Sequence, residues 1–266
     1  MANTMSPKAN IHPSASIGDN NIFEDNVIIK ENCKIGNNNY FQSGSIIGPH
    51  VEIKDNNFFG SYCFIGGEAQ DLDFKNEISY VRIGSYNKIR EFVTVHRGTK
   101  GESATVVGDN NYMMAYAHMG HNSKIGDYNV LVNTSQLAGY SELGNRVVMS
   151  AFAAVHQFCK VGDYVMIGGG AKINKDVPPF TMVFGTPAKV VNLNIVGLRR
   201  NGFNAETREK IKDIYNLFYH SGYPFSTAIE KIASKYPEDR EALQIINFFK
   251  NSKRGIIGFG RENSRD

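Results

Sequence analysis

The sequence of 266 residues contains no tryptophan, has no long apolar run, and holds only three cysteines: Cys33, Cys63 and Cys159. An odd cysteine count without a CxxC pair argues against a disulfide or zinc framework and favours a reducing compartment. No segment approaches the roughly 18 apolar residues of a membrane-spanning helix, and the N-terminus lacks the apolar core of a secretion signal. The net charge of +3 is too small to indicate the excess of basic residues that is typical of nucleic-acid-binding proteins. We therefore expect a cytoplasmic protein that binds no nucleic acid and is not stably inserted in a membrane.

What the sequence does have is a strict repeat of six residues. Stepping in sixes from Ile11 to Ile173 visits 28 positions, and 25 of them are Ile, Leu, Val, Met or Phe. The exceptions are Asp71, Glu77 and Gly101. The position four residues after each of these apolar anchors is mostly small or Asn, and it holds all three cysteines. We therefore expect the cysteines to be buried, small core residues.

A period of six fits neither an α-helix nor a simple alternating strand. It fits a short strand followed by a turn, and three such units make one triangular coil. The strands of successive coils then stack into parallel sheets. We expect the glycine after each anchor, and the nearby Asn or Asp, to supply the turn conformations. The predicted fold class is all-β, a parallel β-helix of hexapeptide repeats with about nine coils.

Two segments, residues 66–82 and 98–106, lose the repeat, which then resumes in phase. We expect both to be loops extruded from one turn each, and loops on a rigid scaffold commonly carry function. The segment DVPPF at 176–180 is expected to stop the prism because of its prolines.

Beyond this segment the apolar residues recur at helical spacing. We expect three amphipathic helices, at 204–221, 225–236 and 238–251. The sequence therefore predicts a β-helix domain over 1–190 and a small helical domain over 191–266.

The stretch AYAHMGHNSKIG places His118 and His121 three residues apart. Moving forward by one coil, which is three repeats, leads from His121 to Gly139, and a second coil leads to Gln157, so these three share one column. Tyr140 and His156 lie one position from that column. We therefore expect one edge of the prism to gather His118, His121, Gly139, Tyr140, His156 and Gln157.

Three interpretations of this cluster are compatible with the residues. Histidines at turns can simply be solvated. They can bind zinc, but that needs three well-placed imidazoles, and the third candidate, His96, is remote in the chain. A neutral imidazole is also suited to removing a hydroxyl proton. We favour a general base, with no metal and no cofactor.

Seven segments occur in order along the chain: GEAQDL (67–72), TVHRGT (94–99), AHMGH (117–121), LAG (137–139), AVHQFC (154–159), DVPP (176–179) and NIVGLRRNGF (194–203). This set resembles the UDP-N-acetylglucosamine O-acyltransferases, which perform the first step of lipid A synthesis for lipopolysaccharide. The resemblance covers nearly the whole chain, and AVHQFC and NIVGLRRNGF are its most specific parts. It implies a homotrimer of left-handed β-helices. It also implies transfer of an (R)-3-hydroxyacyl group from acyl carrier protein to the 3-position of UDP-N-acetylglucosamine.

The resemblance further implies the roles of individual residues. His121 is the catalytic base, and the backbone N–H of Gly139 holds the oxyanion. Gly169 limits the acyl length, and glycine there implies a long chain. Arg200 contacts phosphate at the nucleotide end, together with Asn194. The full set of implied substrate contacts is Gln70, Asp71, His118, Tyr140, His156, Gln157, Gly169, Asn194 and Arg200.

Four positions depart from the pattern of the family. Asn122 stands where an Asp is common, Tyr140 where a histidine is common, Val196 replaces an acidic residue and Asp73 a basic one. Alternatives are therefore amide formation on the 3-amino analogue of the UDP-sugar, or the later N-acyltransferase of the same pathway. An ice-binding or purely structural solenoid would repeat a flat face without extruded loops or edge histidines.

Overall fold

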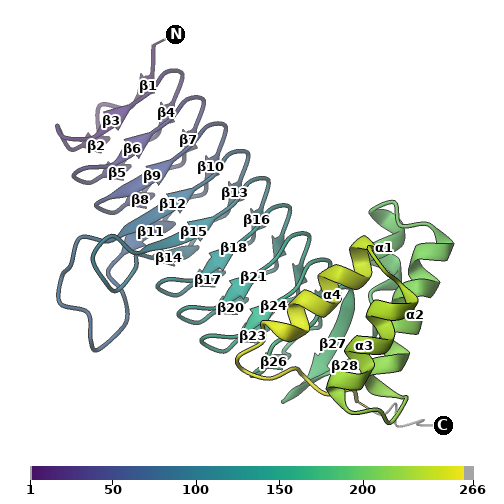
Figure 1. Ribbon diagram of the computed structural model, residues 1–266. Coiled ribbons are helices and arrows are strands. Elements are labelled where there is room, and N and C mark those ends of the chain that lie inside the picture. The colour runs from purple at the N-terminus through teal and green to yellow at the C-terminus, as the bar shows by residue number, and fades with distance from the viewer. Residues whose placement is uncertain (1, 261–266) are drawn as a thin grey trace.

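The computed structural model describes residues 2–260 and shows a three-sided column of stacked coils, with helices packed at its C-terminal end (Figure 1). Each coil contributes one short strand to each of three sheets, so that, as far as β26, neighbours in a sheet are three strands apart in the chain. All neighbouring pairs are parallel except the last pair of the first sheet. The predicted parallel β-helix of six-residue repeats is confirmed.

The first sheet contains β1 (Thr4–Met5), β4 (Ile22–Phe23), β7 (Tyr40–Phe41), β10 (Phe58–Phe59), β13 (Lys88–Ile89), β16 (Tyr112–Met113), β19 (Val130–Leu131), β22 (Val148–Met149), β25 (Met166–Ile167), β27 (Thr181–Gly185) and β28 (Ala188–Leu193). The second contains β2 (Asn10–Ile11), β5 (Ile28–Ile29), β8 (Ile46–Ile47), β11 (Phe64–Gly67), β14 (Thr94–His96), β17 (His118–Met119), β20 (Gln136–Leu137), β23 (Ala154–Val155) and β26 (Lys172–Ile173). The third contains β3 (Ser16–Ile17), β6 (Lys34–Ile35), β9 (Val51–Ile53), β12 (Tyr80–Ile83), β15 (Ala104–Val107), β18 (Lys124–Ile125), β21 (Glu142–Leu143) and β24 (Lys160–Val161). The helices are α1 (Ile195–Arg200), α2 (Ala205–Tyr219), α3 (Phe225–Lys235) and α4 (Arg240–Lys250).

The apolar anchors form the core of the prism. Every apolar anchor from Phe23 to Ile173 is buried, whereas Ile11 and Ile17 in the first coil are partly exposed. The three cysteines are also buried, as predicted, and they carry free thiols. Stacking equivalent positions of successive coils excludes water from a continuous apolar interior, which is what gives a repeat fold its stability.

The turns differ from the prediction about glycine. The left-handed corner positions are taken mainly by Asn and, unusually, by aromatic residues such as Tyr62 and Phe92. Among the glycines that follow an anchor, only Gly66 has a positive φ. The others are required by space: a Cβ at Gly36 would lie 2.9 Å from the carbonyl oxygen of Lys54 on the next coil. Glycine therefore permits the coils to approach one another, and the corner residues supply the turn.

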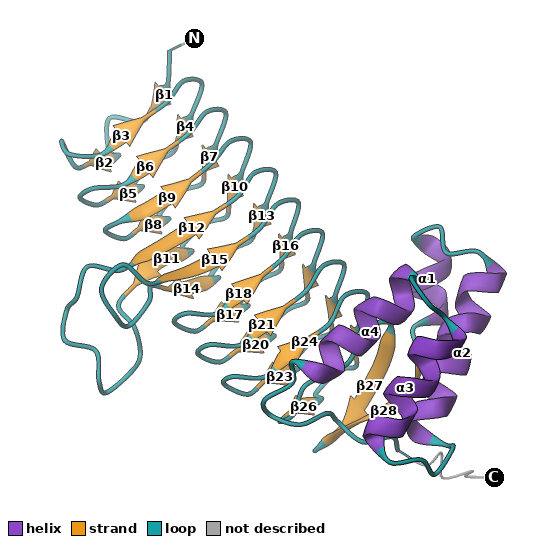
Figure 2. Cartoon of the chain, viewed as in Figure 1, coloured by secondary structure: helices purple, strands orange, loops and turns teal. Residues whose placement is uncertain are grey.

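Both predicted loops are present, and they lie beside each other on one side of the prism (Figures 1 and 2). The first joins β11 to β12 and the second joins β14 to β15. Ser79 Oγ donates to the Gly98 carbonyl (2.6 Å), and the guanidinium of Arg97 lies 5.2 Å from the ring centroid of Phe74. These contacts hold the first loop against the second, on the histidine-bearing edge.

The prediction that residues 176–180 stop the prism is wrong by part of a coil. Val177 pairs with Val161, and β27 then stacks in parallel on β25 before β28 reverses direction. The helices α2, α3 and α4 match the predicted ones to within two residues, whereas α1 was not foreseen. Asn204 and Asp239 cap α2 and α4, each accepting a backbone N–H with its side-chain oxygen. Within residues 2–260, no helix has the length and apolar character needed to cross a bilayer.

Candidate active site

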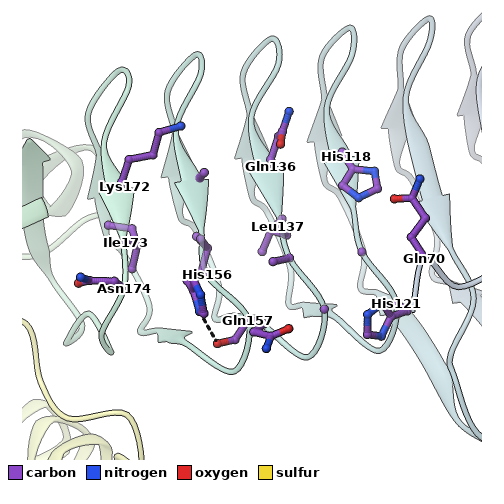
Figure 3. Close-up of a pocket in the computed structure, with 15 residues that line it drawn as sticks. Gln70, His118, His121, Gln136, Leu137, His156, Gln157, Lys172, Ile173 and Asn174 are labelled. Atoms are coloured by element: carbon purple, nitrogen blue, oxygen red, sulfur yellow. Dashed lines mark hydrogen bonds between the residues drawn. The ribbon is translucent and has the colours of Figure 1, made fainter. Parts of the chain in front are cut away.

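A groove of about 500 Å³ runs along the edge that carries the histidines (Figure 3). It crosses the coils of β17, β20, β23 and β26. The predicted site residues that line it are Gln70, His118, His121, Gly139, His156 and Gln157. The register of three repeats per coil therefore brought together side chains that are far apart in the sequence.

His121 lies in the turn that follows β17, and it is only 8% exposed. Its Nδ1 is 3.1 Å from Oδ1 of Asn122, which accepts the ring N–H. The other ring nitrogen, Nε2, then carries the lone pair. The ring packs directly over Gly139, because a Cβ built there would lie 2.4 Å from both Cε1 and Nε2 of His121. Glycine at 139 is thus required for the ring to occupy this place.

Gly139 also offers a donor beside the ring. No described residue accepts a hydrogen bond from its backbone N–H, whereas the next N–H, that of Tyr140, donates to the His121 carbonyl (2.9 Å). A free N–H next to a neutral imidazole is the combination that acyl transfer needs, because it can receive the negative oxygen that forms when a hydroxyl attacks a carbonyl.

The first loop brings a carboxylate to the same ring. Oδ2 of Asp71 is 3.6 Å from His121 Nε2, and Gln70 beside it lines the groove. At this distance the carboxylate does not take up Nε2 in a hydrogen bond while the ring is neutral. Once Nε2 has gained a proton, the negative carboxylate would stabilise the positively charged ring.

His118 is held neutral by its surroundings. Burial, reinforced by the nearby His96 and His121, lowers the pKa of His118 to about 4. Its Nδ1 is 2.7 Å from the hydroxyl of Thr94 on the preceding coil. At neutral pH His118 can therefore offer a hydrogen bond to a ligand but no positive charge.

The far end of the groove holds residues that the sequence argument missed. Lys172, Ile173 and Asn174 line this end, and Gln136, also missed, lies on the coil next to that of His118. His156 donates from Nδ1 to the Gln157 carbonyl (3.1 Å). The register itself contained the signal, because Gln136 and Lys172 lie one and three coils beyond His118 in the same column. Lys172 is the cationic side chain of the groove lining.

Five predicted residues do not line the groove of a single chain: Asp71, which reaches the site only by its approach to His121, and Tyr140, Gly169, Asn194 and Arg200. The Tyr140 ring stands edge-on to His121, with the ring centroids 5.4 Å apart. The side chain of Asn194 is used within the chain, since Oδ1 caps α1 and Nδ2 donates to the Tyr164 carbonyl (2.8 Å). Arg200 is exposed on α1. Among residues 2–260, no three His, Cys, Asp or Glu side chains are grouped closely enough to hold a metal ion.

A parallel β-helix of six-residue repeats with a histidine-lined groove on one edge defines a hexapeptide-type acyltransferase. Residues 32–67 match the family model "bacterial transferase hexapeptide (six repeats)", and residues 176–257 match domain 2 of UDP-N-acetylglucosamine O-acyltransferase. The acyl-[acyl-carrier-protein]–UDP-N-acetylglucosamine O-acyltransferase of a Sulfurihydrogenibium species is 51% identical over 188 residues, which cover 70% of this chain and 69% of that protein. The chain belongs to the UDP-N-acetylglucosamine O-acyltransferase family.

Solved structures agree along nearly the whole chain. The UDP-N-acetylglucosamine acyltransferase of Bacteroides fragilis is 39% identical with a TM-score of 0.91, over 95% of this chain and 99% of that one. The enzyme from Francisella novicida is 36% identical with a TM-score of 0.94, over 99% and 97% of the two chains. The fold is thus the left-handed parallel β-helix followed by a small helical domain.

Proposed function

We propose that the protein transfers an (R)-3-hydroxyacyl group from acyl carrier protein to the 3-hydroxyl of UDP-N-acetylglucosamine, the first step of lipid A synthesis. The observation that carries this proposal is the buried His121, whose Nε2 is free beside the unused N–H of Gly139. Family membership supports the choice of substrates, since the named relatives are acyl-[acyl-carrier-protein]–UDP-N-acetylglucosamine O-acyltransferases.

The reaction needs one proton to be moved twice. His121 Nε2 takes the proton of the sugar 3-hydroxyl while that oxygen attacks the thioester carbonyl. The negative oxygen of the tetrahedral intermediate is received by the Gly139 N–H. When the carbon–sulfur bond breaks, the protonated ring returns its proton to the leaving thiolate. Asp71 stabilises the charged ring between these two transfers.

The remaining groove residues are proposed to bind the two substrates. His118 and Gln70 contact the sugar, and His156 and Gln157 contact the acceptor or the acyl group. Gly169 lies outside the groove of its own chain, and a Cβ built there would have its nearest neighbour at 3.6 Å, so we propose that this position leaves space for a long acyl chain. No cofactor enters the reaction. The cytoplasmic location and the division into residues 1–190 and 191–266 stay predictions.

An assay with purified components tests the proposal. The protein is offered a ladder of (R)-3-hydroxyacyl carrier proteins with UDP-N-acetylglucosamine, and the products are weighed by mass spectrometry. We expect an ester product with a long acyl chain, and at least a tenfold smaller kcat/KM for acyl-CoA donors, which lack the carrier-protein surface. Faster transfer to the 3-amino UDP-sugar would make the protein an amide-forming enzyme instead. No transfer to either sugar would refute the proposal.

We also propose that the working enzyme is a homotrimer, in which a second copy completes the site. Gly169, Asn194 and Arg200 do not line the groove of their own chain. α1 stands at the C-terminal end of the prism (Figure 1), and no residue of the helices lines the groove of their own chain. Arg200 of a neighbouring chain is therefore the residue proposed to reach the nucleotide phosphates, for which a guanidinium is well suited.

Mixing two inactive variants tests the shared site. H121A and R200A are unfolded together, refolded and assayed beside each variant refolded alone. In a random cyclic trimer about a quarter of the sites would pair a wild-type His121 with a wild-type Arg200 from the neighbour, so about a quarter of the activity should return. If both residues serve the same chain, the mixture will be no more active than the two variants separately. Light scattering checks the mass of the refolded species.

A further inference from the structure

Asn122 contacts the catalytic histidine from the position where the turn reverses. It is only 8% exposed, adopts the left-handed conformation (φ 60°), and places Oδ1 3.1 Å from Nδ1 of His121. Its backbone N–H donates to Oγ1 of Thr105 (2.8 Å), whose hydroxyl in turn donates to the His96 carbonyl (2.6 Å). Thr105, in β15 directly after the second loop, thus holds the backbone of Asn122 in place.

The orientation of the Asn122 amide is decided by Thr99. The backbone N–H of Thr99 lies 3.1 Å from Oδ1 of Asn122, and the Thr99 hydroxyl lies 3.0 Å from the same atom. A backbone N–H can only donate, so the atom that faces it must be the amide oxygen rather than the amide nitrogen. That oxygen also faces His121, and it therefore selects the tautomer with the proton on Nδ1.

Tyr140 belongs to the same set of contacts. It occupies the equivalent corner of the next coil, again with a positive φ (58°). Its hydroxyl is 2.8 Å from the hydroxyl of Thr99, and its ring stacks on Phe158 with the centroids 5.0 Å apart. The two departures from the family pattern at 122 and 140 are thus connected through one threonine of the second loop.

We propose that Thr99 and Tyr140 are positioning residues: their linked hydroxyls add a second donor to the Thr99 backbone N–H, and the neutral side chain of Asn122 needs this second donor to keep the one orientation that presents its oxygen to His121. This inference rests on the proposed function for its kinetic readout. An amide has one acceptor atom and one donor group, so a free rotation by half a turn would present the wrong atom to Nδ1. A carboxylate has two equivalent acceptors and would not need such a support.

The substitution N122D therefore distinguishes a role of Thr99 and Tyr140 in orienting the amide from a role in stabilising the fold. No described residue accepts a hydrogen bond from Nδ2 of Asn122, so the exchange removes no donor that the chain uses. We expect T99V to lower kcat/KM about tenfold and Y140F about threefold in the wild-type background, as the loss of one hydrogen bond would. In the N122D background the same two substitutions should each cost less than about twofold. T99S, which keeps the hydroxyl, should restore the wild-type rate.

Two readouts do not depend on the size of the rate. The ring ¹⁵N shifts of histidine-labelled protein, with His121 assigned by its absence in H121Q, should show more of the Nε2–H tautomer in T99V than in the wild type. In N122D the acid limb of the pH–rate profile should move to higher pH, because a second carboxylate, besides Asp71, would then face a ring that also neighbours His118 and Tyr140. Y128F, at an exposed corner, is the matched control for Y140F.

The outcomes separate this proposal from the proposed function. Equal losses for T99V in the two backgrounds would overturn the positioning role, because they would reveal a structural role only. Unchanged ¹⁵N shifts in T99V would overturn it as well. Wild-type protein that transfers no acyl group would refute the function alone, since the tautomer would still be read from the shifts.

Discussion

Replacing His121 by alanine should lower kcat/KM for acyl transfer about 10³-fold, with a far smaller change in KM. The reason is that a positioned general base contributes roughly 10²- to 10⁴-fold to such a reaction. A loss of this size corresponds to about 4 kcal/mol of transition-state stabilisation. Steady-state kinetics with the carrier-protein donor measures the effect, and thermal unfolding checks that the variant is folded.

H12A is the matched control, because His12 lies on the first coil and its Nδ1 contacts only the neighbouring Ser14. It should retain full activity. An H121A enzyme that stays within tenfold of the wild type would mean that another group removes the proton. His118, neutral because its pKa is lowered to about 4, would then be the next candidate.

Adding a single methyl group at Gly139 should be nearly as damaging. A Cβ there would lie 2.4 Å from two atoms of the His121 ring, well inside contact distance, so the ring must move. A displacement of about 1 Å of a catalytic group can cost about 10²-fold in rate. We therefore expect G139A to lose about 10²-fold in kcat, although its backbone N–H is retained.

The cause can be separated from a general loss of stability. In the H121A background the ring is absent, so G139A should then cost neither further activity nor thermal stability. G101A is the matched control, because a Cβ at Gly101 meets no atom within 4 Å. Should G139A lower the unfolding temperature equally with and without His121, the contact between ring and glycine would not be the explanation.

The prism could be predicted from the sequence because each six-residue repeat corresponds to one strand and turn of a coil. Outside the two loops, each apolar anchor is three repeats from its neighbour on the next coil. One register therefore determines which residues are buried, which strands pair and which residues lie in the same column. Helices α2 to α4 could be predicted from apolar residues that recur at helical spacing. The hairpin of β27 and β28 and the short α1 could not be predicted, because neither carries a repeat, and α1 has only six residues to display a period.

The site was predictable only in part, for a similar reason. Residues within the repeat, such as His118, Gly139 and Gln157, could be placed by counting. The loops have no register, so the approach of Asp71 to His121 and the support of Asn122 by Thr99 depend on tertiary contacts alone. Residues of the helical domain are separated from the groove in one chain, and counting could not show where they lie.

The two ends of the prism are unlike. At the N-terminal end β1, β2 and β3 each have a strand on one side only, and both residues of β1 are exposed. At the other end β27, β28 and the helices cover the last coil (Figure 2). In a stack where each coil contacts only its neighbours, fraying starts at the uncovered end and advances coil by coil. The groove lies toward the covered end, so the first coils can exchange their amide protons or be cut by a protease while the catalytic edge stays assembled.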